Sequence, residues 1–337
     1  MLEKPDLDDE AISACLEAEF GLTAVRIAFL PLGADQNTAV YRAVAGDGTD
    51  YFVKLRRGDF NAAAVAVPKY LSDLGIEGVI PPIATQTGEL WAGLGNFKVI
   101  LYPFVDGRNG FEVSLSDRHW IEFGAVLRRF HDAGLPPEIT RGVPRERYDP
   151  KWREIVRYFL GHLDESRFEE PVALELARFL KTERDETLRL VDRAERLGTT
   201  LRSHEAEFIL CHADIHAGNL LVAPNGALYM IDWDTLIYAP KERDLMFVGG
   251  GLGGEGHTPQ DEIDLFYQGY GRVQIDPVAL AYYRYARIVE DIGVYCEKIF
   301  LSDEGGEDRE QSLEYLKSNY LPNGTIEIAY QSDGTQS

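Results

Sequence analysis

CHADIHAGN at residues 211–219, followed by MIDWD at residues 230–234, is the stretch from which this 337-residue chain is best interpreted. Transfer of a phosphoryl group from ATP needs a carboxylate that takes the proton of the acceptor hydroxyl, and oxygen ligands that hold Mg²⁺ against the phosphates. Asp214 is the candidate base, and Asn219 and Asp232 are the candidate metal ligands. The alternative is that the polar residues of the first segment only shape a loop by bonding local backbone, but this leaves the second acidic cluster unexplained.

The residues between the two segments explain how these groups could meet. LLVA at 220–223 and ALYMI at 227–231 flank PNG at 224–226, which is a strong signal for a hairpin turn. The hairpin is predicted to fold Asp232 back toward Asn219, so that the two side chains can share one ion.

The pattern HxDxxxxN followed by IDxD resembles that of the aminoglycoside phosphotransferases, small-molecule kinases that share the bilobal fold of protein kinases. Three further segments are similar to the spectinomycin phosphotransferase branch of that family: PKWREIVR at 150–157, APKERDLMF at 239–247 and RIVED at 287–291. The resemblance implies an α+β, bilobal protein-kinase-like fold, with an N-terminal antiparallel sheet lobe and a larger, mainly helical C-terminal lobe. It also implies ATP and Mg²⁺ at a site where Asp214 is the base and His212 supports the catalytic loop.

Composition favours a soluble intracellular enzyme with a small-molecule substrate. The net charge of −22 argues against nucleic acid or an anionic membrane as a partner, because both require clustered Lys and Arg. A cationic or polyhydroxylic substrate fits this charge better, although the charge also serves solubility alone. Residues 1–10 are acidic and lack the basic start and apolar stretch of a secretion signal, and the apolar runs are short of the ~20 residues that span a bilayer. We therefore expect a cytoplasmic enzyme of unspecified oligomeric state, with its widely spaced cysteines as reduced core thiols.

The first hundred residues predict strands and turns after an opening helix. Helical spacing covers residues 8–20, and strand patterns follow at 24–32, 38–45 and 50–55. The loop between the first two strands, from Gly33 to Asn37, could bring backbone N–H groups close to phosphate oxygens. In the resembled family this loop covers the nucleotide, so both end residues are candidate nucleotide contacts; an ordinary tight turn is the alternative.

Lys54 lies in an otherwise apolar strand, where a charged side chain needs a partner. In the kinase-like fold the matching lysine contacts the α and β phosphates, whereas the alternative is an edge-strand lysine that reaches water. Kinases usually pair this lysine with a glutamate on the next helix, yet residues 61–70 contain no acidic residue, and Ala62 stands where one is expected. Asp59 is a candidate substitute, and Pro68 is expected to make this helix irregular.

A lobe boundary is predicted where the strand FKVILYPFV at 97–105 runs into DGRNG at 106–110. The predicted domains are a nucleotide-binding lobe at 1–105 and a helical catalytic and substrate-binding lobe at 106–337. By resemblance, the end of the strand is the hinge that binds adenine, with three candidate contacts: Tyr102, Phe104 and Val105. A plain interdomain linker is the alternative.

Helical periodicity dominates the rest of the chain. It covers residues 116–133, 150–162, 171–197 and 277–300. The glycine-rich stretch at 249–256 lacks the lysine and hydroxyl of a phosphate-binding loop, so we expect a flexible connection. The acidic stretch at 302–310 is expected to form a mobile loop.

Four residues are candidate contacts of the acceptor: Asp234, Tyr238, Glu242 and Glu290. Asp234 could support the metal or bind a substrate hydroxyl. Asp244 is expected to tie the catalytic loop to the helical core instead. Glu290 and Asp291 are adjacent on a helix and hence about 100° apart, so they cannot both face one pocket squarely.

Three functions stay open on these observations. The first is a kinase that phosphorylates a hydroxyl of an aminocyclitol or aminoglycoside antibiotic such as spectinomycin. The second is a kinase of a small metabolite of the choline, homoserine or sugar type, which the same catalytic residues would serve. The third, a nucleotide-binding protein without transfer activity, is suggested only by the missing glutamate. Substrate choice depends on the shape of the pocket, which the motif does not specify.

Overall fold

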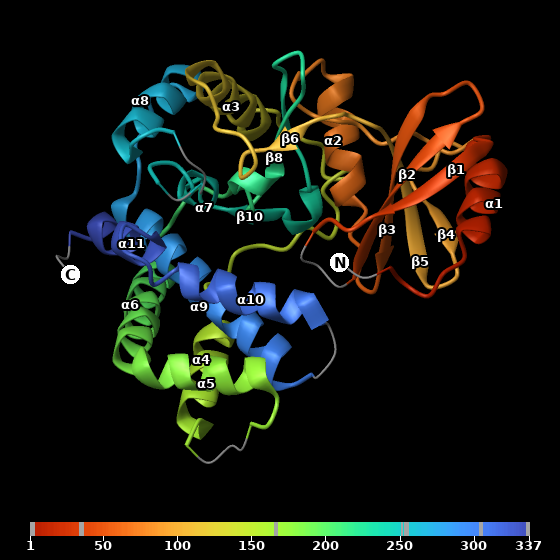
Figure 1. Ribbon diagram of the computed structural model, residues 1–337. Coiled ribbons are helices and arrows are strands. Elements are labelled where there is room, and N and C mark those ends of the chain that lie inside the picture. The colour runs from red at the N-terminus through yellow and green to blue at the C-terminus, as the bar shows by residue number, and fades with distance from the viewer. Residues whose placement is uncertain are drawn as a thin grey trace.

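A five-stranded antiparallel sheet organises the N-terminal part of the computed structural model (Figure 1). Its strand order is β1-β2-β3-β5-β4, formed by β1 (Ala24–Leu30), β2 (Thr38–Ala45), β3 (Asp50–Arg57), β4 (Ala92–Leu94) and β5 (Phe97–Pro103). The structure describes residues 4–33, 37–164, 168–250, 252, 256–302 and 306–334. The centre of the loop between β1 and β2, as well as residue 251 and residues 253–255 of the glycine-rich stretch, therefore lies outside the described residues.

Helix α1 (Asp9–Phe20) covers one face of this sheet. It ends at Gly21, whose φ of 66° is the left-handed conformation that glycine adopts without steric cost. Ile12 and Leu16 are fully buried and pack with the inward side chains of β2 and β3. The helix and the β2–β3 hairpin predicted from the sequence are confirmed.

Helix α2 (Ala63–Asp73) packs away from the core between α1 and the sheet. Its buried residues, including Val67 and Leu71, join a hydrophobic core that also contains Leu220 and Met230 of the β8–β9 hairpin. The irregularity expected at Pro68 does not interrupt the helix. Pro68 is itself buried, and its packing offsets the single backbone hydrogen bond that the ring removes.

Short strands build residues 209–239, which we call the catalytic segment because they contain the predicted base and metal ligands. Strand β7 (Ile209–Cys211) pairs with β10 (Ile237–Ala239), and β6 (Arg108–Asn109) extends the hairpin of β8 (Leu220–Val222) and β9 (Leu228–Met230). Two 3-10 turns, η1 (Ala217–Asn219) and η2 (Trp233–Thr235), follow β7 and β9. The backbone N–H of Ile231 donates to the carbonyl of Asn219 at 3.0 Å, so the predicted hairpin does return the chain to this residue.

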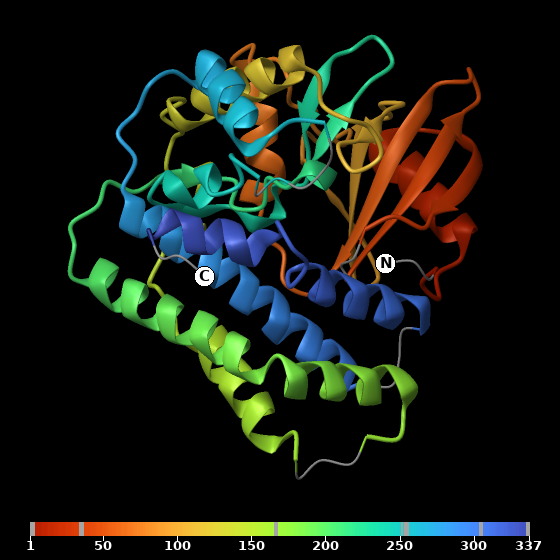
Figure 2. The same cartoon turned by 60° about the vertical axis from the view of Figure 1, so that its left-hand side comes forward.

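A long central helix, α9 (Pro277–Phe300), organises the remainder (Figure 2). The helices that pack against it are α4 (Lys151–His162), α5 (Pro171–Thr182), α6 (Arg184–Arg202), α7 (Glu242–Leu245), α10 (Gly306–Ser318) and α11 (Thr325–Ser332). Helix α3 (Asp117–His131) packs instead on α8 (Pro259–Tyr270). A sheet-based N-terminal part and a helical C-terminal part together confirm the predicted α+β class.

Two expectations about helices were wrong. The single helix expected over residues 171–197 is broken at Glu183, which ends α5 and begins α6. A single straight helix over these residues would not keep its whole length against α9. With the break at Glu183, α5 and α6 both contact α9. The stretch expected to form a mobile loop contains residues 303–305, outside the described residues, but residues 306–310 form the first turns of α10. Within the described ranges, no helix is both long enough and apolar enough to cross a membrane.

Candidate active site

The loop that carries Asp214 is held by a buried carboxylate. Ala213 has a φ of 70°, which is uncommon for a residue with a Cβ atom and needs support from its surroundings. Asp244 of α7 supplies this support, because its carboxylate accepts hydrogen bonds from the backbone N–H groups of His212 at 2.9 Å and Ala213 at 2.6 Å. The structural role expected for Asp244 is confirmed.

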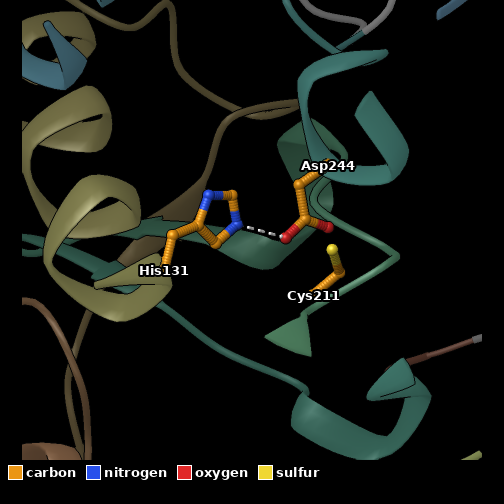
Figure 3. Close-up of side chains that lie close together, drawn as sticks. All are labelled: His131, Cys211 and Asp244. Carbon is orange, nitrogen blue, oxygen red and sulfur yellow. Dashed lines mark hydrogen bonds and ion pairs between the residues drawn. The ribbon is translucent and has the colours of Figure 1, made fainter. Parts of the chain in front are cut away.

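His131 and Cys211 lie beside this carboxylate (Figure 3). His131 Nε2 is 2.9 Å from Asp244 Oδ2, and His131 Nδ1 is 2.8 Å from the hydroxyl of Tyr270. The three side chains could in principle hold a metal ion, but both Asp244 oxygens already accept backbone hydrogen bonds. Burial also raises the pKa of the Cys211 thiol, so the thiolate that a metal prefers is disfavoured. We assign this cluster to support of the catalytic loop.

Asn219 and His212 fix the loop from inside. Asn219 Nδ2 donates to the carbonyl of Asp214 at 2.8 Å, which leaves the amide oxygen of Asn219 free to act as a ligand. His212 is fully buried, and its Nε2 lies 3.0 Å from the carbonyl of Ile231, immediately before Asp232. His212 therefore links the loop that carries Asp214 to the end of the hairpin.

Lys54 of β3 reaches across to the residues after β9. Its Nζ lies 2.9 Å from Asp232 Oδ1 and 2.9 Å from Asp234 Oδ2. Burial alone would lower the pKa of Lys54, but the two carboxylates raise it, and Lys54 in turn holds the pKa of Asp232 below its ordinary value. Asp59, the partner considered from the sequence, is exposed, and Asp234 stands in place of the missing helix glutamate.

Arg287 of α9 is a functional candidate that the sequence analysis missed. Its Nη1 donates to Asp214 Oδ1 at 2.5 Å, and its Nε donates to Asp291 Oδ1 at 3.0 Å. Burial by itself would raise the pKa of Asp214, but the charge of Arg287 holds it below its ordinary value. Arg287 lay within a segment that indicated the family, yet spacing alone gave no reason to connect it with a loop 73 positions away.

His216 was also missed as a site residue, although it lies within the motif. Its Nδ1 accepts a hydrogen bond from the backbone N–H of Gly218, and its Nε2 is 3.7 Å from Asp214 Oδ2. The ring of Phe111 stacks on it with centroids 5.6 Å apart. Burial lowers the pKa of His216, which favours a neutral ring beside the candidate base.

The candidate nucleotide contacts lie at the ends of the sheet strands. Gly33 and Asn37 flank residues outside the described ranges, so only the ends of that loop are placed. Tyr102 is the penultimate residue of β5. Burial raises the pKa of its hydroxyl, the charge of Lys54 opposes this, and the charges of Asp234 and Asp232 add to it, so the hydroxyl lies in the electrostatic field of the Lys54 cluster. Beyond the strand, the ring of Phe104 lies 4.6 Å from the Arg42 guanidinium, and Val105 is half-buried.

The four candidate acceptor contacts have different surroundings. Asp234 is bound to Lys54, and the hydroxyl of Tyr238 donates to Thr140 at 2.9 Å.

Glu242 is 2% exposed and accepts a hydrogen bond from the backbone N–H of Asp276 at the start of α9, so its carboxylate joins α7 to α9. Glu290, with a side chain 35% exposed, lies 3.9 Å from Arg243. Glu290 is thus the member of this group with an accessible carboxylate on the helix that carries Arg287.

The chain matches a phosphotransferase family and is similar to solved structures of phosphotransferases. The model described as "Phosphotransferase enzyme family" matches residues 28–308. A spectinomycin phosphotransferase in complex with ADP and spectinomycin is 36% identical, with a TM-score of 0.90 over 98% of this chain and 99% of that chain. The AMP-bound complex of a spectinomycin phosphotransferase is 35% identical, with a TM-score of 0.85 over 96% and 98% of the two chains. A choline kinase from Streptococcus pneumoniae shares the fold at 14% identity and a TM-score of 0.54, over 92% and 99% of the two chains.

Proposed function

The chain belongs to the phosphotransferase enzyme family, and from that premise we propose that it moves the γ-phosphoryl group of Mg-ATP to a hydroxyl of spectinomycin or a related aminocyclitol. The family predicted from the sequence motif is confirmed, and the chain is a small-molecule phosphotransferase. The observation that carries the proposal is the convergence of Asp214, Asn219 and the Lys54–Asp232 pair in a chain 36% identical to a spectinomycin-binding relative.

Asp214 is the group that handles the proton. The acceptor O–H bond breaks, the proton passes to the Asp214 carboxylate, and the freed oxygen forms a bond to the γ-phosphorus. The bond from that phosphorus to the β–γ bridging oxygen breaks, and ADP leaves with this oxygen. Arg287 assists by keeping the carboxylate ionised, because a protonated Asp214 could not accept the proton.

The residues proposed for Mg²⁺ have the right donor atoms. Asn219 commits its amide nitrogen to Asp214, which leaves its oxygen as an available ligand. Asp232 presents a side chain that is 48% exposed, and Lys54 keeps it ionised. Oxygen donors of this kind suit Mg²⁺, which would neutralise charge on the phosphates when bound.

The N-terminal lobe, residues 1–105, supports nucleotide binding. Lys54 is positioned to contact phosphate, because it already bridges the sheet and the proposed metal ligand. Backbone groups from Tyr102 to Val105 are proposed to bind adenine, and the loop bounded by Gly33 and Asn37 is proposed to cover the phosphates.

The acceptor is proposed to approach Asp214 from the side of α9. Glu290 offers an accessible carboxylate there, which suits a cationic group on a polyhydroxylic substrate. The C-terminal lobe, residues 106–337, would thus supply both the base and the acceptor contacts.

ADP release by purified protein with Mg-ATP tests the proposal. It would be measured with spectinomycin, with a panel of aminoglycosides, and with choline and homoserine. Spectinomycin-dependent release, together with a mass increase of one phosphoryl group on the drug, is the expected result. Release only with a metabolite would replace the acceptor class, and absence of release with every acceptor would overturn the assignment.

A further inference from the structure

Two side chains one turn apart on α9 hold the candidate base in a fixed arrangement. Arg287 uses two different nitrogens, Nη1 on Asp214 at 2.5 Å and Nε on Asp291 at 3.0 Å. A planar guanidinium held at two edges cannot rotate freely, and such charge-assisted contacts are among the stronger hydrogen bonds in proteins. The side chains of Arg287, Asp214 and Asp291 are 29%, 20% and 25% exposed, so the group is largely sheltered from water.

The helix that carries the pair is itself firmly placed. At Gly293, a Cβ atom would lie only 2.7 Å from the ring of Trp152, so α9 approaches α4 closely at this point. The guanidinium of Arg287 also lies 6.0 Å from the centre of the Phe247 ring, on the segment after α7. Arg287 therefore connects Asp214, a loop residue, to a helix whose position is fixed by close packing.

Among the described residues, none donates a hydrogen bond to one oxygen of Asp214, Oδ2. Oδ1 is taken by Arg287, whereas Oδ2 has His216 Nε2 at 3.7 Å, which is too long for a hydrogen bond. We propose that Arg287 and Asp291 are positioning residues for the base, with Asp291 preventing the guanidinium from turning onto both oxygens of Asp214. Oδ2 is then the oxygen that receives the acceptor proton. This inference rests on the proposed function of Asp214.

Asp291 acts on Asp214 only through Arg287. Without Asp291, the guanidinium is free to bind Asp214 in the two-pronged geometry that arginine prefers with carboxylates, and this would cover Oδ2. Without Arg287, there is nothing for Asp291 to restrain. The effect of Asp291→Asn should therefore disappear when Arg287 is already absent.

A double-mutant cycle tests this dependence. Wild type, Arg287→Met, Asp291→Asn and the double variant would be compared for kcat and for the KM of ATP, with the acceptor that wild type uses. Each single variant should lower kcat about 10–100-fold, because small misplacements of a catalytic group have effects of that size. The KM for ATP should stay within about twofold, since neither residue lies among the proposed nucleotide contacts. The double variant should match Arg287→Met.

Two further variants keep the test independent of folding. Arg287→Lys retains the charge but cannot bind two carboxylates with a rigid fork, and it should recover only part of the lost kcat. Asp132→Asn removes the acid of the Arg128–Asp132 pair at the C-terminal end of α3, which has the same residue types and spacing at an exposed position, and it should leave kcat unchanged. Thermal melts and ATP binding would confirm that all variants are folded.

The positioning role would be overturned by any of three results. These are a kcat of the double variant that is reduced by the product of the two single reductions, a raised KM for ATP in either single variant, and a wild-type kcat in Asp291→Asn. An Arg287→Met variant that transfers phosphate at the wild-type rate would do the same, and it would leave the proposed function intact. A wild type that transfers phosphate to no acceptor would instead remove the proposed function, and the inference with it.

Discussion

At the scale of single residues, Asp214 is expected to control turnover without controlling nucleotide binding. Asp214→Asn keeps the size of the side chain and the backbone contact to Asn219, but an amide cannot accept the acceptor proton. We expect kcat to fall by about 10²–10⁴, the usual range for loss of a general base. Calorimetric titration with Mg-ATP should give a dissociation constant close to that of wild type. Normal turnover in this variant would show that the base is another group.

Asp234 is expected to matter through Lys54. Asp234→Asn removes one of the two carboxylates that hold the ammonium group at 2.9 Å, and the lysine should then be less well placed for phosphate. We expect the KM for ATP to rise about tenfold, the equivalent of one charge-assisted hydrogen bond. Asp59→Asn is the matched control, because Asp59 is exposed and should leave the KM unchanged. Equal effects in the two variants would mean that Asp234 does not anchor Lys54.

Asp291 makes a contribution to the free energy of unfolding that depends on pH. Burial, opposed by Arg287 and supported by Glu290 and Asp214, raises the pKa of Asp291 from 3.8 to about 6. The folded state therefore binds this proton more tightly than the unfolded chain does. Stability contributed by Asp291 should increase as the pH falls from 7.5 through 6.

Asp291→Asn lacks this titration. The free energy of unfolding of wild type, measured relative to that of this variant, should therefore rise by about 1 kcal/mol as the pH is lowered from 7.5 to 5. One pKa unit corresponds to that order of energy. The groups that face Asp291 and remain in both proteins are Arg287, Glu290, Asp214 and Tyr295. Urea unfolding at several pH values measures the difference, and a difference that does not change with pH would contradict the assignment.

Predictability at this scale depended on whether residues are close in sequence. Asp214 and Asn219 share one loop, and a readable hairpin connects them to Asp232, so local spacing was sufficient to propose the three together. Arg287 reaches Asp214 only because the tertiary fold brings α9 to the loop, and no local sequence signal indicates this contact. The partner of Lys54 was sought on the following helix, whereas the structure provides it from η2.

At the scale of elements, the contact between α3 and α8 depends on glycine. A Cβ atom at Gly269 would lie 1.8 Å from the carbonyl oxygen of Ile121, and one at Gly124 would lie 2.2 Å from that of Phe266. Gly269→Ala should therefore force the helices apart and lower the free energy of unfolding by about 3 kcal/mol.

Gly161 near the end of α4 is the matched control for this substitution. An added Cβ atom there meets no atom within 4 Å, so Gly161→Ala should stabilise the protein by about 0.5–1 kcal/mol. Chemical denaturation measures both changes. Similar stability changes in the two variants would mean that the close helix contact is absent in solution.

Elements were predictable where local signals agreed with packing. The α1 helix, the β2–β3 hairpin and α9 follow periodicity and turn residues that lie within the elements themselves. The break at Glu183 has no proline or glycine to announce it, and it arises because α5 and α6 must both cover α9. Pro68 gave a local signal that the buried position of α2 overrides.

At the scale of the whole molecule, the site joins parts that have separate cores. The sheet and α1 enclose one core, α9 and its neighbours enclose another, and α2 shares the core of the catalytic segment. The Lys54 contacts to Asp232 and Asp234 cross from the sheet to that segment. Nucleotide bound at this junction would be held by both parts. The bilobal arrangement was expected from the resemblance to the aminoglycoside phosphotransferases, and the strand patterns before residue 105 and the helical patterns after it agreed with that expectation.

Transfer of label from ATP to the acceptor tests the central claim most directly. Wild type would be incubated with spectinomycin and ATP carrying a radioactive γ-phosphate, with Mg²⁺ and after removal of metal by a chelator. We predict that label appears on spectinomycin in the presence of Mg²⁺, and that it disappears with the chelator and in Asp214→Asn. Label that stays on ATP or appears only as inorganic phosphate, with folded wild-type protein and Mg²⁺ present, would contradict the account.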